Sequence, residues 1–269
     1  MFDYGDGMVP QRDPDARERL AGLAPRISSG PLAGERSLPV VPVLAELLPT
    51  GLTRGSTVAC SGRAAMSSAF LVAAGASQAG MWVGVAGVAA LGVQACREAG
   101  VALERLVAVR EPGSAATPAA RDELWGQVLG ALVDGFDLVL FGAAAQIRPG
   151  TARRVQSRLQ SRGAVLVIVG RPGPFSCDVQ VTSESAWDGL GDGHGHLRAR
   201  RVDLAIDGRR IQRTRRGSIW FPDATGEIAP VRPAEAPVDV VVAGLLAADV
   251  SAPAVDAAPH DPIPLRRTG

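Results

Sequence analysis

The sequence contains no lysine and no asparagine, and all 28 of its basic residues are arginine. An abundance of Ala, Gly, Arg and Pro points to a GC-rich genome as the simplest cause. The chemical consequence is the same whatever the cause. A lysine amine forms Schiff bases and reaches the β- and γ-phosphates in phosphate-binding loops. Catalysis that requires a lysine is therefore excluded for this chain.

The sequence also has few cysteines and a net charge close to zero. Cys60, Cys96 and Cys177 form an odd, widely spaced set without metal-ligand spacing, which predicts reduced thiols rather than disulfides. The formal net charge of +1 excludes a chain-wide basic field that would gather nucleic acid, so any such site must be local. The polar, acidic N-terminus is unlike a signal peptide, and we expect a cytoplasmic protein.

No charged residue occurs between Arg63 and Arg97, and this run raises the alternative of a membrane-spanning helix. Gly75, Gly80 and Gly84 divide the run into shorter elements. We therefore expect a buried helix, a turn and a strand here, and no membrane association.

Strand-like and helix-like segments alternate between residues 57 and 169. Strands are expected at 57–60, 82–86, 106–109, 138–141 and 164–169, with helices at 67–78, 91–99, 119–133 and 151–162. This alternation favours an α/β fold with a mostly parallel sheet and helices on both faces, followed by an antiparallel β-hairpin. We divide the chain into an N-terminal arm or docking helix (1–37), an α/β domain (38–222) and a disordered Pro/Ala-rich tail (223–269).

The turn after the strand at 57–60 is the place where a phosphate-binding loop would lie, because a helix N-terminus follows it. Counting from Gly62, the positions that the loop motif reserves for Gly, Lys and Ser or Thr hold Ser67, Ser68 and Ala69. These residues supply neither the charge for phosphates nor the hydroxyl for magnesium. We expect no cofactor here, with Ser68 as a helix N-cap and a weak anion site as the alternative.

The segments LPTGLTRGSTVACSG and GMWVGVAGVAALGVQACREAGVALERLVAVREP resemble the RecA family, and the similarity covers roughly residues 38–221. In ATP-hydrolysing members a catalytic glutamate follows the second strand, where this chain has Gly87. Magnesium needs an acidic residue at the end of a central strand, and the run FDLVLF is followed instead by Gly142 and Ala143. The resemblance implies a RecA-like fold without catalytic activity.

Within this superfamily the chain is most similar to the actinobacterial ImuA-type mutasome accessory proteins. The similarity rests on its length, the degenerate phosphate loop, the arginine-rich hairpin and the Pro/Ala-rich tail. The resemblance implies an adaptor in damage-induced translesion synthesis and mutagenesis, part of the SOS response. Its implied partners are a Y-family polymerase-like protein and an error-prone C-family DNA polymerase. A DNA-binding recombinase remnant and an unconventional ATPase are the alternatives, and self-association is conceivable.

Arginine is concentrated between residues 196 and 217, where eight arginines stand against two aspartates. Asp207-Gly208 predicts a two-residue hairpin turn, which places Arg200 opposite Arg215. The charges either keep an edge hairpin from associating with other strands or contact a DNA backbone or an acidic partner. The candidate residues are Arg198, Arg200, Arg201, Arg209, Arg210, Arg213, Arg215 and Arg216.

The tail contains an apolar segment at residues 238–250 that is too short and isolated to build a core. Such a segment either folds on a partner or docks on its own domain. The residues proposed for partner binding are Val240, Val241, Val242, Leu245 and Leu246. Two histidines in a glycine-rich loop, His194 and His196, are too weak a signal for a metal site, and none is expected.

Overall fold

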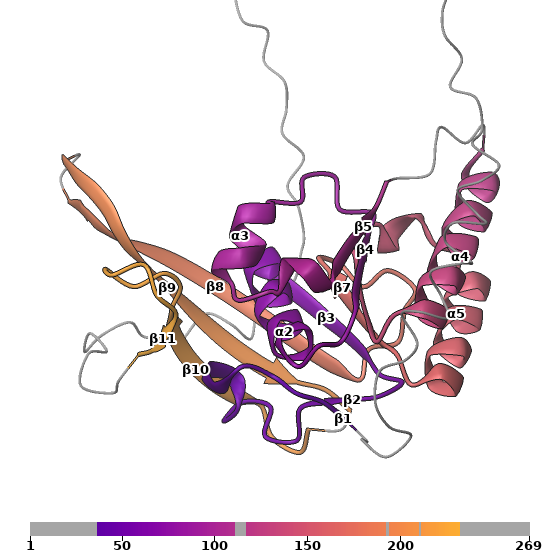
Figure 1. Ribbon diagram of the computed structural model, residues 1–269, viewed down its shortest axis with the longest axis horizontal. Coiled ribbons are helices and arrows are strands. Elements are labelled where there is room, and N and C mark those ends of the chain that lie inside the picture. Colours follow the sequence, from indigo (N-terminus) through magenta and orange to yellow (C-terminus); the bar gives the residue numbers. More distant parts are fainter. Residues whose placement is uncertain (1–36, 111–116, 192–193, 210, 232–269) are drawn as a thin grey trace, which may run out of the picture. The chain divides into compact units, whose positions relative to one another are not determined.

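Figure 1 shows the computed structural model, which describes residues 37–110, 117–191, 194–209 and 211–231. Within these residues the chain forms a nine-stranded sheet in the order β11-β10-β9-β8-β3-β7-β6-β4-β5. Pairing is parallel from β8 to β5 and antiparallel from β8 to β11, so the sheet is mostly parallel with an antiparallel extension.

The parallel part of the sheet comprises β3 (Thr57–Gly62), β4 (Val83–Ala86), β5 (Leu106–Val109), β6 (Leu138–Phe141) and β7 (Val165–Val169). The extension comprises β8 (Val179–Gly191), β9 (His194–Asp207), β10 (Arg215–Trp220) and β11 (Ala229–Pro230). A separate antiparallel pair is formed by β1 (Ser37–Leu38) and β2 (Leu52–Thr53). The helices are α2 (Ala65–Gln78), α3 (Val93–Glu98), α4 (Pro118–Gly135) and α5 (Pro149–Arg162), with short 3-10 helices η1 (Pro42–Leu44), η2 (Leu103–Arg105) and η3 (Ala144–Gln146).

Helices cover both faces of the parallel strands, and each face has its own apolar core. Leu138 and Leu140 of β6 belong to the cluster that contains α2, whereas Val139 and Phe141 belong to the cluster that contains α4 and α5. Figure 1 shows α4 and α5 side by side, as their mutual contacts require. Alternate strand residues thus serve opposite faces, which confirms the expected α/β architecture.

Local sequence signals explain where α4 and α5, the two helices on the second face of the sheet, begin and end. Thr117 accepts a hydrogen bond from Ala120 N at 3.2 Å and caps α4, and Pro149 opens α5. Gly163, at φ +72°, ends α5 in a left-handed C-cap. Asp122 of α4 is buried and accepts hydrogen bonds from Arg148 N at 2.7 Å and from the Thr151 hydroxyl at 2.9 Å, so it fixes the start of α5.

The expected two-residue turn at Asp207-Gly208 is wrong. β9 pairs with β10 in a different register, with Ile206 opposite Arg215 and Val202 opposite Ile219, so residues 208–214 connect the strands. Burial decides the register, because this pairing puts Ile219 and Val202 together in the core while the expected one would oppose Val202 with an arginine. β8 and β9 form a further antiparallel pair, with Gly191 opposite His194.

Among the described residues, no helix is both long and apolar enough to cross a membrane. The uncharged run after Arg63 forms α2, a glycine turn and β4, as the glycine spacing predicts. The tail was expected at 223–269, but residues 223–231 belong to the described part of the chain and contain β11, while residues 1–36 and 232–269 lie outside it.

Candidate functional site

The turn between β3 and α2 is the position of the degenerate phosphate loop. β3 ends at Gly62 and α2 begins at Ala65, so only Arg63 and Ala64 join them. Gly62 has φ +91°, and a Cβ atom there would collide with Ser183 O of β8. The turn therefore lies directly against the sheet, without the additional residues that surround an anion in a phosphate-binding loop.

The other three candidates of this turn lie inside α2. The Ser67 hydroxyl accepts a hydrogen bond from Arg200 Nη2 at 2.7 Å. Ser68 is buried, its amide donates to Ala64 O at 2.8 Å, and its Oγ has no hydrogen-bond partner within the described part of the chain. The expectation that Ser68 caps the helix is wrong, because the N-cap of α2 is Ala64, four residues earlier. Ala69 is fully buried in the core.

The carboxyl ends of β4 and β6 meet at two glycines, Gly87 and Gly142, the positions at which carboxylates were looked for in the sequence. Gly142 N donates to Ala86 O at 3.0 Å, which brings the two backbones together. A Cβ atom on Gly142 would collide with Gly87 O, and one on Gly87, at φ +66°, would lie 2.7 Å from the Ala143 Cβ. Neither position has room for a carboxylate side chain.

Arg200 of β9 crosses to the start of α2 instead of facing Arg215. Its Nε donates to Phe221 O at 2.8 Å, and its Nη2 reaches Ser67. The guanidinium carbon lies 5.2 Å from the Phe221 ring centroid and 5.5 Å from that of Trp187, the residue opposite it on β8. Partial burial lowers the pKa of Arg200, although an arginine stays charged. This side chain is a structural bridge and not a free cation.

Two further arginines of the set also have internal partners. Arg201 lies on the opposite face of β9, where its Nε donates to Asp203 at 2.9 Å and its Nη2 to the Ser218 hydroxyl at 3.1 Å. Arg215 Nη1 lies 3.5 Å from the carbonyl oxygens of Glu46 and Leu47, close to the limit of a hydrogen bond. Asp203 therefore offsets the charge of Arg201, whereas Arg215 remains an exposed cation.

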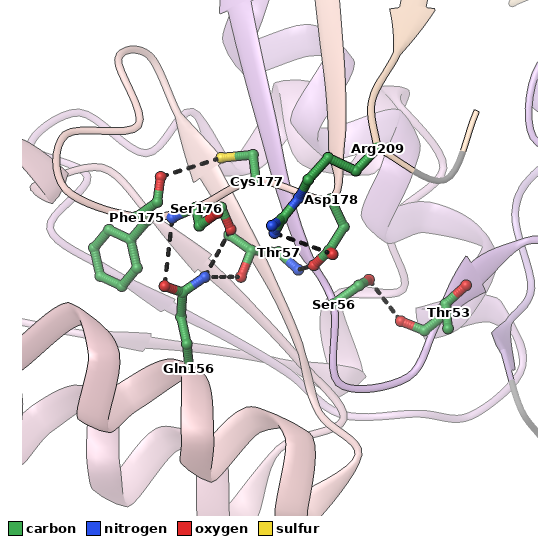
Figure 2. A network of polar contacts seen from close by, with 9 residues as sticks. All are labelled: Thr53, Ser56, Thr57, Gln156, Phe175, Ser176, Cys177, Asp178 and Arg209. Atoms are coloured by element: carbon green, nitrogen blue, oxygen red, sulfur yellow. Dashed lines mark hydrogen bonds and ion pairs between the residues drawn. The ribbon is translucent and has the colours of Figure 1, made fainter. Parts of the chain in front are cut away.

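Arg209 belongs to the polar network drawn in Figure 2, which joins four distant segments. Its Nη2 lies 3.6 Å from Asp178 Oδ1, while Asp178 Oδ2 accepts a hydrogen bond from Thr57 N at 3.0 Å. Gln156 of α5 donates to the Thr57 hydroxyl at 3.3 Å and to Ser176 O at 2.7 Å. The network fastens the segment before β8 to the start of β3 and to α5.

Arg198, Arg213 and Arg216 are the exposed arginines of the set for which the fold supplies no partner described here. Arg198 lies near the end of the β8–β9 hairpin, and Arg213 and Arg216 lie at the other end of β9, around the start of β10. The structure therefore divides the seven described candidates between both ends and both faces of the extension. Arg210 and the tail candidates at 240–246 lie outside the described residues.

Sequence reasoning missed two large apolar side chains that are exposed near the end of the β8–β9 hairpin. Trp187 and Leu197 are 50% and 51% exposed, and they lie on paired strands beside a β-bulge at Gly189. Figure 1 shows this end of β8 and β9 extending past α2 and α3. Aromatic and arginine side chains together are typical of protein interfaces. The alternation of the run CDVQVTSES indicated a strand, but nothing in it showed that Trp187 would be exposed.

The thiols do not form a reactive site. Cys60 and Cys96 are buried, as expected for small core residues, and burial raises the pKa of Cys60 to about 12. Burial also raises the pKa of the partly exposed Cys177, to about 11. Both thiols therefore stay protonated near neutral pH, where a thiolate would be the nucleophile or ligand. Among the described residues, no group of three or more His, Cys, Asp or Glu side chains is arranged to hold a metal ion.

The fold is that of an α/β protein with a mostly parallel sheet and an antiparallel extension. Residues 46–174 match the family model described as the MT3502 N-terminal domain. The matched range contains the β3–α2 turn, both glycines Gly87 and Gly142, and α5, and it ends before β8. A comparison with curated proteins found no match. The extension with its arginines therefore lies outside the matched range.

Proposed function

We propose that this chain is a RecA-like accessory protein that acts without catalysis in damage-induced translesion synthesis, as an adaptor for a Y-family polymerase-like protein and an error-prone C-family DNA polymerase. The resemblance of its sequence to ImuA-type proteins supports this proposal. The strand order supports the RecA-like part, because β3 lies between β7 and β8 and its carboxyl end opens the turn to α2. In open α/β sheets a ligand site lies at such a reversal of strand order.

The observation that carries the proposal is that backbone fills the place at the β3–α2 turn where a nucleotide would bind. The turn has two residues, and Gly87 packs against Gly142 where carboxylates would bind magnesium and activate water. With no lysine in the sequence, the alternative of an unconventional ATPase would lack a phosphate-binding amine as well. A fold that keeps the frame of a nucleotide-binding domain while filling its site is best suited to binding other macromolecules.

The exposed side chains Trp187, Leu197 and Arg198 of the β8–β9 hairpin are the best-suited contacts for the polymerase-like partner. Exposed aromatic and aliphatic groups beside an arginine supply the anchors from which protein interfaces draw most of their affinity. The backbone of this hairpin is held by antiparallel pairing on both sides of a bulge between Asp188 and Leu190, so little ordering entropy is lost on binding.

The proposal predicts that the chain binds the polymerase-like partner without nucleotide and without DNA. The purified chain, immobilised, is expected to retain the Y-family polymerase-like protein of the same organism equally with and without ATP and DNA. Leu197→Asp, which changes an exposed side chain, is expected to lower the affinity roughly 30-fold, the cost of one hot spot of about 2 kcal/mol. Surface titration by biolayer interferometry measures both. Capture that appears only with ATP would contradict the adaptor role.

The arginines at the start of β10 give a second prediction. Replacing Arg213, Arg215 and Arg216 by glutamate reverses three charges on exposed side chains and is expected to weaken binding of the partner or of DNA without unfolding the chain. Thermal denaturation provides the folding control, while a pull-down and a gel shift separate the two ligands. Unchanged binding in both assays would leave these arginines with the role of protecting the sheet edge.

A further inference from the structure

A second basic surface lies on α5, on the face of the sheet opposite α2. The helix contains four arginines and no acidic residue, and all four side chains are exposed. Arg154, Arg158 and Arg162 follow one another at intervals of four residues, which places them in a stripe with steps of about 6 Å along the axis. Together with Ser157 and Ser161 they line an open hollow of about 420 Å³.

The charge of this stripe is only partly offset. Arg158 donates from Nε to Asp134 Oδ1 at 2.6 Å and from Nη2 to Oδ2, and Arg162 Nε lies 3.0 Å from the same Oδ1. The hydrogen bond from Arg158 is the largest reason why the pKa of Asp134 is below its ordinary value. One carboxylate therefore serves two guanidinium groups, which remain 49% and 57% exposed. Arg154 donates to the Thr151 hydroxyl, an uncharged partner.

The exposed side chains of α5 favour a phosphate-bearing ligand over a protein. Between the arginines lie Ser157, Gln160 and Ser161, so the stripe offers hydrogen-bond donors and charge. The large apolar side chains that are exposed in the described part of the chain are Val93, Trp187 and Leu197, none of them on α5. A protein interface needs apolar anchors at its centre, whereas a phosphodiester backbone is bound by guanidinium groups and hydroxyls alone.

We propose that the α5 stripe of Arg154, Arg158 and Arg162 binds the phosphate backbone of DNA, independently of base sequence. Planar guanidinium groups match phosphate oxygens in a bidentate fork, and serine hydroxyls donate to the same oxygens. With no aromatic side chain in α5 for base stacking, a single strand gains nothing over a duplex. This site goes beyond the adaptor role, since it would place the accessory protein on the DNA that its partner copies.

The test compares two variants that each remove three positive charges. One replaces Arg154, Arg158 and Arg162 by glutamine, and the other replaces Arg213, Arg215 and Arg216 by glutamine. Fluorescence anisotropy with a labelled duplex, and with its single strand, gives the affinity between about 50 and 200 mM salt. The α5 variant is expected to lose more than tenfold in affinity at the lower salt. Its slope of log K against log salt should flatten by roughly 2 to 3, at about 0.9 per phosphate contact.

Asp134→Asn separates binding from folding. This substitution also breaks the pairs to Arg158 and Arg162, but it frees both guanidinium groups and removes a negative charge. It is therefore expected to tighten DNA binding several-fold, while the arginine variant weakens it. Loosened packing of α5 on α4 would shift both variants in the same direction, so opposite shifts exclude that explanation.

Three results would overturn the site on α5: a wild-type chain without affinity for either oligonucleotide, an equal loss in the two triple variants, or unchanged DNA binding with loss of partner capture in the α5 variant. The last would make α5 a protein surface. Partner capture that persists while DNA binding is lost would support the DNA site and leave the adaptor role intact. The two proposals are thus tested by different readouts.

Discussion

Gly142→Asp and Gly87→Glu, which would place carboxylates at the ends of β6 and β4, are expected to destabilise the fold by about 3 kcal/mol or more without producing ATP hydrolysis. A side chain on Gly142 must enter the space of Gly87 O, and one on Gly87 must also adopt a positive φ. Because backbone surrounds each position, neither can relax by a rotamer change. Urea denaturation followed by circular dichroism measures the loss in free energy of unfolding.

Gly150 is the matched control for both substitutions. It lies in the first turn of α5 with no atom within 4 Å of an added Cβ, so Gly150→Asp and Gly150→Glu add the same groups into open space. An acidic side chain near a helix N-terminus is neutral to stabilising, and both control variants are expected to unfold at or above the wild-type urea midpoint. Wild-type stability in Gly142→Asp would mean that the two strand ends can separate, and the argument for a filled site would fail.

The strand and helix order could be predicted because it depends on local patterns. Continuous apolar runs and glycine spacing predicted β5 and β6 with the bounds that the structure shows, and the α/β alternation gave the sheet type. The start of α2 could not be predicted in this way. A phosphate-loop motif was counted from Gly62, whereas the length of the turn is set by the pairing of Gly62 with Ser183, a contact across more than a hundred residues.

The positions of the arginines likewise depend on contacts between residues that are distant in the sequence. The Asp207-Gly208 signal was local and strong, but the burial of Ile219 against Val202 outweighed it and moved the register. Arg200 therefore turned from a candidate ligand-binding residue into a bridge to α2. The stripe on α5 is encoded in the spacing of TARRVQSRLQSR, but it was not singled out from the sequence alone, because its exposure depends on α4 packing against another side of the helix.

The bridge formed by Arg200 carries the last prediction. Arg200→Ala is expected to lower the free energy of unfolding by about 2 kcal/mol, because it removes two hydrogen bonds from a charged donor and the stacking on Trp187 and Phe221. Arg200→Lys should recover only part of this loss, since an ammonium group cannot reach Ser67 and Phe221 O in one plane while lying over both rings.

Arg216→Ala is the matched control, because Arg216 is an exposed arginine of the same extension, on β10 opposite Ala205. Its expected effect is within about 0.5 kcal/mol, as for other surface substitutions. Chemical denaturation of the three variants gives the comparison. If Arg200→Ala proves as stable as Arg216→Ala, the bridge contributes nothing to the fold, and Arg200 returns to the set of arginines free to bind a ligand. If the difference appears, binding losses seen in Arg200 variants must be attributed to the β9–α2 contact before any ligand is invoked.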